Sequence, residues 1–296
     1  MSKGDELDKL QIVDTHVHFY DMKHPELFYA HWQPDVIHPI LGTQTRKLSE
    51  TNFLAEDYID ETKPYNVISA VHVQAAIGSK DPVKETEWLQ AASNKHEFPQ
   101  AIIAYANLKD PQVEKIIEKH CEYKNMRGIR DFSFGDYLVD SDFHKGFSLL
   151  EKYNLIGNVS VTFKDMDKLV ILANKFPNIK IVIDHCGFPE ERSSEYFEKW
   201  QSSISTAAKA DNIICKISGL GMGDHKWTIK SIKPYIMHCI ESFGIERCIW
   251  GSNWPIDKLW SSFEDVVKVY TKITEDFSHD DKTAIFSQNA TSLYRI

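Results

Sequence analysis

Short apolar runs rich in valine and isoleucine alternate along the chain with longer amphipathic segments. Near-continuous apolar runs are typical of strands in a parallel sheet that helices cover. The expected strands cover residues 11–18, 67–76, 101–107, 127–132, 155–161, 179–186, 212–219 and 247–253. Eight such strand–helix pairs predict a (β/α)8 barrel rather than a doubly wound open sheet. Barrels of this kind use about 250 residues or more as one unit, so residues 1–296 are expected to form a single domain.

Several of the expected helices begin at a capping signal. Asp81-Pro82 and Asp110-Pro111 each place a capping acid before a proline at the first helical position. The other expected caps are Ser141, Asp165, Ser193 and Ser261.

The connection between the first two strands, residues 19–66, is far longer than the roughly 2–6 residues of an ordinary βα loop. In a barrel, the loop after a strand lies on the catalytic face. This loop is rich in aromatic residues, namely Tyr20, Phe28, Tyr29, Trp32 and Phe53. Two uses remain open: the aromatic side chains cap a pocket, or they pack the loop onto the barrel rim.

The net charge and the cysteine content indicate which partners and which cellular compartment to expect. The net charge of −9 argues against nucleic acid as the main partner, although a few arginines inside a pocket still permit an anionic small molecule. The five cysteines are widely spaced and form no CxxC pair, which is typical of free thiols in a reducing compartment. The N-terminus has no apolar signal core, and no apolar stretch reaches the ~18 residues of a membrane span. We therefore expect a cytoplasmic protein without a membrane partner; a homo-oligomer is left open.

The first candidate site lies on the first strand, in the run VDTHVH. Alternation along a strand places Asp14, His16 and His18 on one face, which we expect to point into the barrel, with the β-branched residues facing outward. Two imidazoles at positions i and i+2 can reach one cation or one substrate oxygen. An HxH pair at the end of the first barrel strand therefore indicates a functional site.

Two further strand ends carry polar residues. His185, in the run IDHCG, shares parity with Ile181 and Ile183 and is expected to point inward beside His16 and His18. By the same reasoning, Cys186 is expected to pack rather than to act as a nucleophile. Asn253, in the run WGSNWP, is expected at the catalytic end of the last strand; an amide that only caps a turn is the alternative.

Taken together, these motifs resemble the amidohydrolase superfamily, and within it the branch of sugar-acid lactonases and 2-pyrone-4,6-dicarboxylate lactonase. The matching segments run from about residue 12 to the C-terminus: VDTHVHFYD, HVQAA, ETEWLQAA, RGIRDF, IDHCGFPE, CKISGLG, WGSNWPI and NATSLYRI. The resemblance implies that His16, His18 and His185 line the active site. It also implies that Arg130, and less directly Arg127, bind the substrate carboxylate or lactone.

Asn253 departs from the family pattern, which usually reads GSDWP with an aspartate that binds metal or activates water. An amide cannot accept a proton and is a weaker ligand than a carboxylate. Three explanations remain open: another base, such as Asp131, Asp257 or a histidine; a former enzyme that only binds its ligand; or an engineered Asp→Asn change. A two-metal centre is not expected. One divalent ion bound by His16, His18 and His185 remains chemically feasible, with Zn²⁺ as the most suitable ion, and so does a site without metal.

Three other residues are weaker candidates for substrate binding. Lys216 is unusual in a buried strand and either forms an internal ion pair or reaches an anionic substrate. Gln74 either orients a ligand or is a hydrogen-bonded core residue, and Trp254 either shapes the pocket wall or packs at the rim.

The sequence therefore predicts an enzyme that opens a small lactone by attack of water on the carbonyl, with an anionic or polyhydroxylated small molecule as substrate. Imidazoles, with or without one metal ion, stabilise the developing oxyanion. Two alternatives are kept: a metal-dependent decarboxylase, which the resemblance also allows, and a catalytically silent binding protein.

Overall fold

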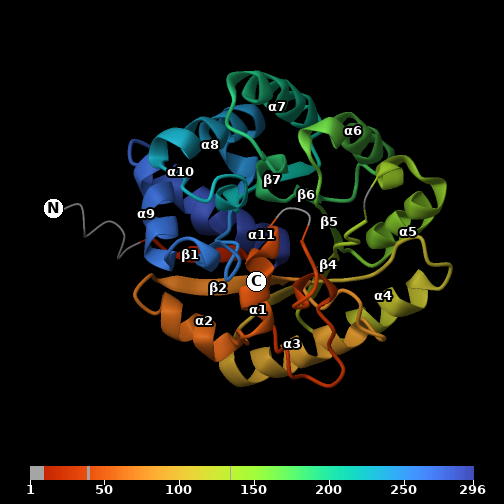
Figure 1. Ribbon diagram of the computed structural model, residues 1–296. Helices are drawn as coiled ribbons and strands as arrows, with labels where there is room; N and C mark the ends of the chain where they lie inside the picture. Colours follow the sequence, from red (N-terminus) through yellow and green to blue (C-terminus); the bar gives the residue numbers. More distant parts are fainter. Residues whose placement is uncertain (1–9, 39–40, 134) are drawn as a thin grey trace.

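Eight parallel strands form the centre of the protein, in a computed structural model that describes residues 10–38, 41–133 and 135–296 (Figure 1). Each strand pairs with the next one along the chain, from β1 to β8. The strands are β1 (Ile12–Val17), β2 (Val67–Val73), β3 (Ala101–Ala104), β4 (Met126–Ile129), β5 (Ile156–Val159), β6 (Ile181–Ile183), β7 (Ile213–Ile217) and β8 (Cys248–Trp250). This is the predicted (β/α)8 barrel.

Contacts between the first and last strands bring the two edges of the sheet together. Thr15 Oγ1 donates to the carbonyl of Trp250 at 2.7 Å. Just beyond the strands, the backbone N–H of His18 donates to the carbonyl of Trp254 at 2.8 Å.

The helices lie outside the strands, and α2 to α9 follow one another around the barrel (Figure 1). They are α1 (Arg46–Ser49), α2 (Ala55–Thr62), α3 (Val83–His96), α4 (Val113–Cys121), α5 (Ser141–Lys152), α6 (Met166–Lys175), α7 (Ser194–Ala207), α8 (Ile229–Phe243), α9 (Phe263–Ile273), α10 (His279–Thr283) and α11 (Asn289–Tyr294). Among the residues placed by the structure, no helix combines the length and apolar character needed to cross a membrane.

The capping predictions are partly right. Ser193 accepts a hydrogen bond from the backbone N–H of Tyr196 at the start of α7. The caps of α5 and α9 are Asp140 and Ser262, one residue away from the predicted Ser141 and Ser261. Each neighbour carries an oxygen that can accept from the first helical turn, so sequence alone does not separate them.

The barrel interior is filled by aliphatic side chains from seven strands. They are Val13, Val71, Val73, Ala101, Ile103, Ile156, Val182, Ile214 and Ile249. Ala290 and Tyr294 of α11 pack into the same cluster, beside the start of β1. This helix therefore covers the end of the barrel opposite the catalytic face.

The predicted faces of the first strand are wrong for Val13 and Asp14. Val13 points into the barrel, whereas Asp14 points outward and accepts hydrogen bonds from Tyr58 of α2 at 2.9 Å and from the backbone of Ser252 at 2.8 Å. The pairing register of β1 with β2 shifts between Asp14 and Val17, which breaks the strict alternation. Because of this shift, His16 points inward although Asp14 does not.

The long segment after β1 serves both uses that the sequence left open. Tyr20, Tyr29 and Phe53 are buried, and the Tyr29 and Trp32 rings stack at 5.5 Å, which packs the segment onto the rim. Trp32 also lines a pocket at the barrel mouth, with its ring 6.0 Å from that of His18. The segment thereby covers part of the catalytic face.

Candidate active site

Three histidines from distant parts of the chain meet at the C-terminal end of the barrel. The Nε2 atoms of His16 and His18 are 3.1 Å apart, and the rings of His16 and His185 are 4.4 Å apart between centroids. All three side chains are buried. The structure thus brings together the three imidazoles that the sequence singled out.

Each imidazole is held through its Nδ1 atom. His18 Nδ1 lies 2.8 Å from the carbonyl of Val73, which can only accept, so this histidine carries its proton on Nδ1. His185 Nδ1 lies 2.8 Å from the hydroxyl of Ser218, and His16 Nδ1 lies 3.3 Å from Asp184 Oδ1. The Nε2 lone pair of His18 is thereby available to an ion or a substrate.

The histidines are neutral over the physiological pH range. Burial lowers the pKa of His185 to about 3, although the nearby Asp184 carboxylate opposes this. Burial also holds the pKa of His16 and of His18 well below the usual value. Neutral imidazoles can ligate metal or accept a proton.

A divalent ion fits this arrangement. Two nitrogens bound tetrahedrally to one Zn²⁺ are about 3.3 Å apart, close to the distance between the Nε2 atoms of His16 and His18. His16, Asp184 and His185 also offer three ligand atoms that all lie within 4.8 Å of one another. Asp184 is therefore either a ligand itself or the carboxylate that orients His16.

Asp184 is the central anion of the site, and the sequence analysis missed it. Its carboxylate accepts from Lys216 Nζ at 3.0 Å, Arg130 Nη1 at 3.0 Å and Asn158 Nδ2 at 2.7 Å. Burial alone raises the pKa of Asp184, but Lys216, His16 and Arg130 together hold it well below its usual range. Parity misled the prediction, because Val182 and Asp184 point inward and Ile181 and Ile183 pack outward.

His185 reaches the site through a left-handed turn after β6. The backbone φ angles of His185, Cys186, Gly187 and Phe188 are 52°, 54°, 70° and 48°. Residues other than glycine pay about 1–2 kcal/mol each for this conformation, so the surroundings must hold it. Trp200 Nε1 donates to the carbonyl of Cys186 at 2.9 Å, which fixes the turn from α7.

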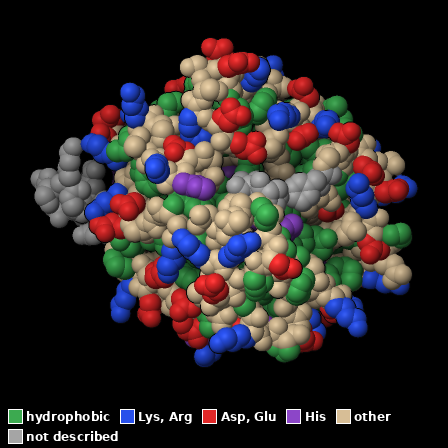
Figure 2. Space-filling model, in the orientation of Figure 1, with side chains coloured by type: hydrophobic (Ala, Val, Ile, Leu, Met, Phe, Trp, Pro, Cys, Tyr) green, Lys and Arg blue, Asp and Glu red, His purple; other side chains and the backbone are tan. Residues whose placement is uncertain are grey.

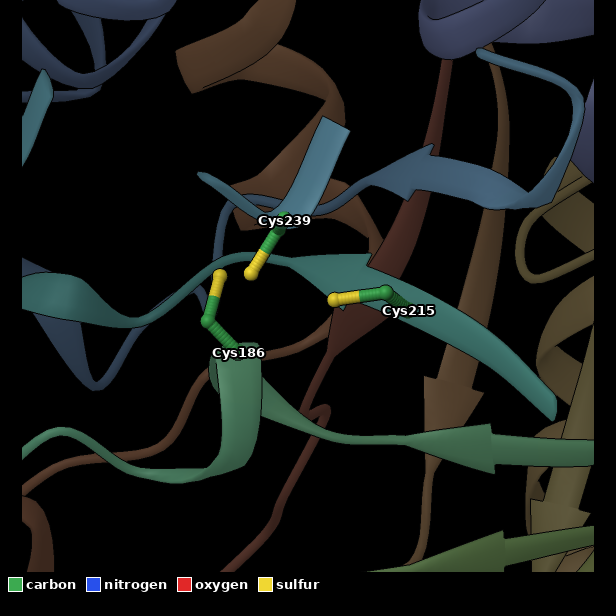
Figure 3. A group of neighbouring side chains, drawn as sticks. All are labelled: Cys186, Cys215 and Cys239. Atoms are coloured by element: carbon green, nitrogen blue, oxygen red, sulfur yellow. The ribbon is translucent and has the colours of Figure 1, made fainter. Parts of the chain in front are cut away.

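Cys186 also belongs to a cluster of buried thiols behind the turn (Figure 3). The sulfur atoms of Cys186, Cys215 and Cys239 lie within 4.8 Å of one another and come from the turn, β7 and α8. All three side chains are fully buried in the apolar layer between strands and helices. They pack there as small apolar residues, in agreement with the expectation for Cys186.

A small pocket of about 70 Å³ opens over the imidazoles. Its polar lining consists of His18, His31, His38, Gln74, Arg130, His185 and Asn253. Among the described residues that line it, none is a carboxylate. His31 and His38, in the long segment after β1, have no periodic pattern that could have placed them here. Figure 2 shows histidine side chains near the centre of this face.

Two side-chain donors of this pocket are buried without a hydrogen-bond acceptor. Arg130 gives Nη1 to Asp184 and Nη2 to the carbonyl of Gln74 at 2.9 Å, but its Nε has no partner. Asn253, held at a φ of 60°, buries Nδ2 without an acceptor at hydrogen-bond distance, and its side chain also interacts with the buried Asp257 carboxyl. Unsatisfied buried donors are rare, and the unpaired Nε of Arg130 beside this pocket indicates a place for an acceptor oxygen of a ligand.

The alternative bases considered from the sequence do not face this pocket. Asp131 accepts from the backbone of Leu108 at 2.7 Å and from the hydroxyl of Ser133. Burial raises the pKa of Asp257 to about 8, so this carboxyl is mainly protonated at neutral pH. A histidine is the remaining candidate.

Three sequence-predicted residues lie away from the pocket. Arg127, at the start of β4, binds the carbonyls of Tyr294 and Arg295 at the opposite end of the barrel. The Lys216 ammonium is fully buried and already contacts Asp184, Asn158 and His16, so the internal ion pair is the correct alternative. Trp254 points outward and donates to Glu61 at 2.8 Å. Gln74 does line the pocket.

Comparisons with known proteins agree with this geometry. A family model described as amidohydrolase matches residues 13–296. The chain is 34% identical over 302 residues to the uncharacterized protein y4mH of Sinorhizobium fredii, with 98% of this chain and 100% of the relative covered. It is 26% identical to an L-fucono-1,5-lactonase of Burkholderia ambifaria, with 96% and 95% covered. The crystal structure of an amidohydrolase from Burkholderia multivorans with bound zinc has a TM-score of 0.83 at 20% identity, covering 97% of this chain and 99% of that one.

Proposed function

The chain belongs to the amidohydrolase family, and on that premise we propose that it hydrolyses a small lactone by attack of water on the ring carbonyl. The observation that carries the proposal is a pocket lined by imidazoles and by two side-chain donors, Arg130 and Asn253, in which Arg130 Nε has no acceptor in the protein. The similarity to an L-fucono-1,5-lactonase supports this reaction class.

Arg130 and Asn253 bind the carbonyl oxygen and stabilise the negative charge that develops on it. Donors that are already fixed and desolvated are effective here, because they need no reorganisation during the reaction. In this scheme Asn253 is a donor and not a failed base: an ionised aspartate at this position could not donate to an oxyanion.

The proton of the attacking water goes to a pocket imidazole. His31 is the best placed acceptor, because it is only half-buried while His18, His38 and His185 are buried. Burial and the nearby Arg130 also lower the pKa of His31, but burial lowers the pKa of His38 to about 4 and that of His185 to about 3, which makes those two weak bases. A lactone needs less help for its leaving group than an amide, so one weak base is sufficient.

His16, His18 and His185, with Asp184 beside them, would hold one divalent metal ion. When bound, such an ion would act as a Lewis acid on the carbonyl group. The role of Asp184 is to fix the orientation of His16, and Ser218 and Val73 do the same for His185 and His18.

The test is a panel of aldonolactones and pyrone lactones, assayed with the wild-type protein and with Asn253→Asp. We expect turnover of at least one lactone by the wild type, and a fall of about 10²–10³-fold in kcat for the variant, which loses one oxyanion donor. Higher activity of Asn253→Asp would instead identify residue 253 as a lost base. No turnover of any lactone by either form would contradict the proposal.

A further inference from the structure

A second cavity, of about 440 Å³, lies beside the small pocket over the histidines. The two share Phe188, at the end of the left-handed turn, and Met222, in the loop after β7. The wall between the larger cavity and the imidazoles is thin. Gly219 lines this cavity, and a Cβ on it would lie 2.3 Å from His185 Nδ1.

The two cavities differ in volume, and each can therefore hold a different part of a substrate. Sites that enclose a small molecule are typically about 300–1,000 Å³ in volume. The pocket over the imidazoles, at about 70 Å³, holds the reacting carbonyl and a few neighbouring atoms. The larger cavity alone reaches the usual size of a ligand site.

We propose that the larger cavity is a second subsite, which binds a neutral, hydroxyl-rich ring attached to the lactone. This proposal rests on the proposed function and names its substrate class: the lactone of a disaccharide sugar acid rather than of a single sugar. The lactone carbonyl lies among His18, His185, Arg130 and Asn253, and the second ring extends past Phe188 and Met222.

The lining of the larger cavity suits a sugar ring. Glu190 and Asp224 offer carboxylates that accept hydrogen bonds from hydroxyl groups, and their two charges are balanced by Lys226 and by Arg192, whose Nε lies 3.8 Å from Asp224, so the lining suits a neutral ring. His225 stacks on Trp260 at a ring distance of 4.5 Å and an angle of 20°, which gives a flat, rigid wall. Lys226 supplies a donor beside these acceptors.

Two glycines allow the walls of this cavity to pack closely. A Cβ on Gly223 would lie 2.3 Å from the carbonyl oxygen of Pro189, and the corresponding distance for Gly219 is the 2.3 Å to His185. Any side chain at either position would enter the cavity wall or displace it. The larger cavity and the position of His185 therefore depend on the same two loops, after β6 and after β7.

The experiment compares kcat/KM for gluconolactone and for cellobionolactone, each corrected for spontaneous hydrolysis. We expect the wild type to prefer the disaccharide lactone by about tenfold or more, because the second ring adds contacts in the larger cavity. The double variant Glu190→Ala/His225→Ala should lose this preference and keep its activity on gluconolactone. Glu198→Ala, an exposed carboxylate on α7 that does not line the cavity, is the matched control and should keep the preference.

Equal or lower kcat/KM for cellobionolactone would overturn the subsite, while the proposed lactonase activity would stand. If neither of these two lactones is hydrolysed, calorimetric titration with cellobionate decides about the cavity on its own, and the full lactone panel decides about the proposed function. Binding that Glu190→Ala/His225→Ala weakens supports the subsite, and no binding to the wild type overturns it. Thermal midpoints of all variants confirm that each remains folded.

Discussion

The Lys216 ammonium lies 3.0 Å from the Asp184 carboxylate, and both side chains are fully buried at the catalytic end of the barrel. The same carboxylate binds Arg130 and faces His16, while the same ammonium contacts Asn158. One buried ion pair therefore connects β4, β5, β6 and β7 with the first histidine of the site. Its partners compensate each charge, which is required for charges this far from water.

Removing one member of this pair should be strongly destabilising. We expect Lys216→Met to lower the free energy of unfolding by about 3–5 kcal/mol, because it removes one of the charges that compensate the buried Asp184 carboxylate. Urea unfolding followed by circular dichroism measures the change. Lys199→Met is the control, because Lys199 forms a similar pair with Glu195 at 2.7 Å but at the surface. Equal stability of Lys216→Met and the wild type would contradict this account of the pair.

Asp257 should make the protein less stable as the pH rises. Burial raises its pKa from 3.8 to about 8, so between these values the folded protein binds more protons than the unfolded chain. The contribution of this group is fully present below about pH 4 and is lost as the pH rises towards 8, by about 1.4 kcal/mol per pH unit.

Asp257→Asn should remove this dependence, since an amide does not titrate. Urea unfolding from pH 5 to 8 should show the variant gaining stability relative to the wild type at each step. Asp211→Asn, which changes an exposed carboxylate in the same way, should not show this gain. A constant difference between Asp257→Asn and the wild type across the range would show that Asp257 is not protonated in the folded state.

The barrel could be predicted from the sequence because its strands are near-continuous apolar runs, such as residues 179–183 and 213–217. The three histidines could be found because each lies in a distinctive motif at the end of a strand. Both signals are local, and a parallel barrel then places all strand ends on one face.

The inward and outward faces could not be predicted at the two places where the backbone is irregular. On β1, the register shift after Asp14 exchanges the faces, and after β6, the left-handed turn carries His185 into a site that Asp184 already faces. Neither irregularity leaves a periodic signal. Arg127 is different: its place at the start of a strand, rather than at the end, was a signal that pointed away from the catalytic face.

Thiol labelling tests the burial of the cysteine cluster. Cys121 is exposed, whereas Cys186, Cys215, Cys239 and Cys248 are buried and free. The folded protein should therefore react rapidly at one thiol with Ellman's reagent, and the protein in guanidinium chloride should react at all five. Cys121→Ser should abolish the rapid reaction. Two or more rapid thiols in the folded wild type would contradict the packing of the cluster.

His31 should be needed for the rate rather than for substrate binding if it accepts the proton of the attacking water. His31→Asn keeps the size and polarity of the side chain but cannot take up a proton, so kcat should fall by about 10²–10⁴-fold with little change in KM. His24→Asn is the control, because His24 belongs to the same long segment but does not line the pocket. A change in KM alone would identify His31 as a binding residue instead.

Gly219 should be more important for the position of His185 than for the fold. A Cβ at this residue would lie 2.3 Å from Nδ1 and 2.9 Å from Cγ of the His185 ring, and a ring held by Ser218 cannot yield without moving Nε2. A displacement of about 1 Å in such a site can cost about 100-fold in rate, so we expect Gly219→Ala to lower lactone turnover by that order.

Gly244→Ala is the matched control: its φ of 76° carries a similar backbone cost to the 60° of Gly219, but a Cβ there meets no described atom within 4 Å. Gly219→Ala should therefore lose at least as much stability as Gly244→Ala, and only Gly219→Ala should lose activity. If the two lose activity equally, backbone strain and not the contact with His185 is the cause.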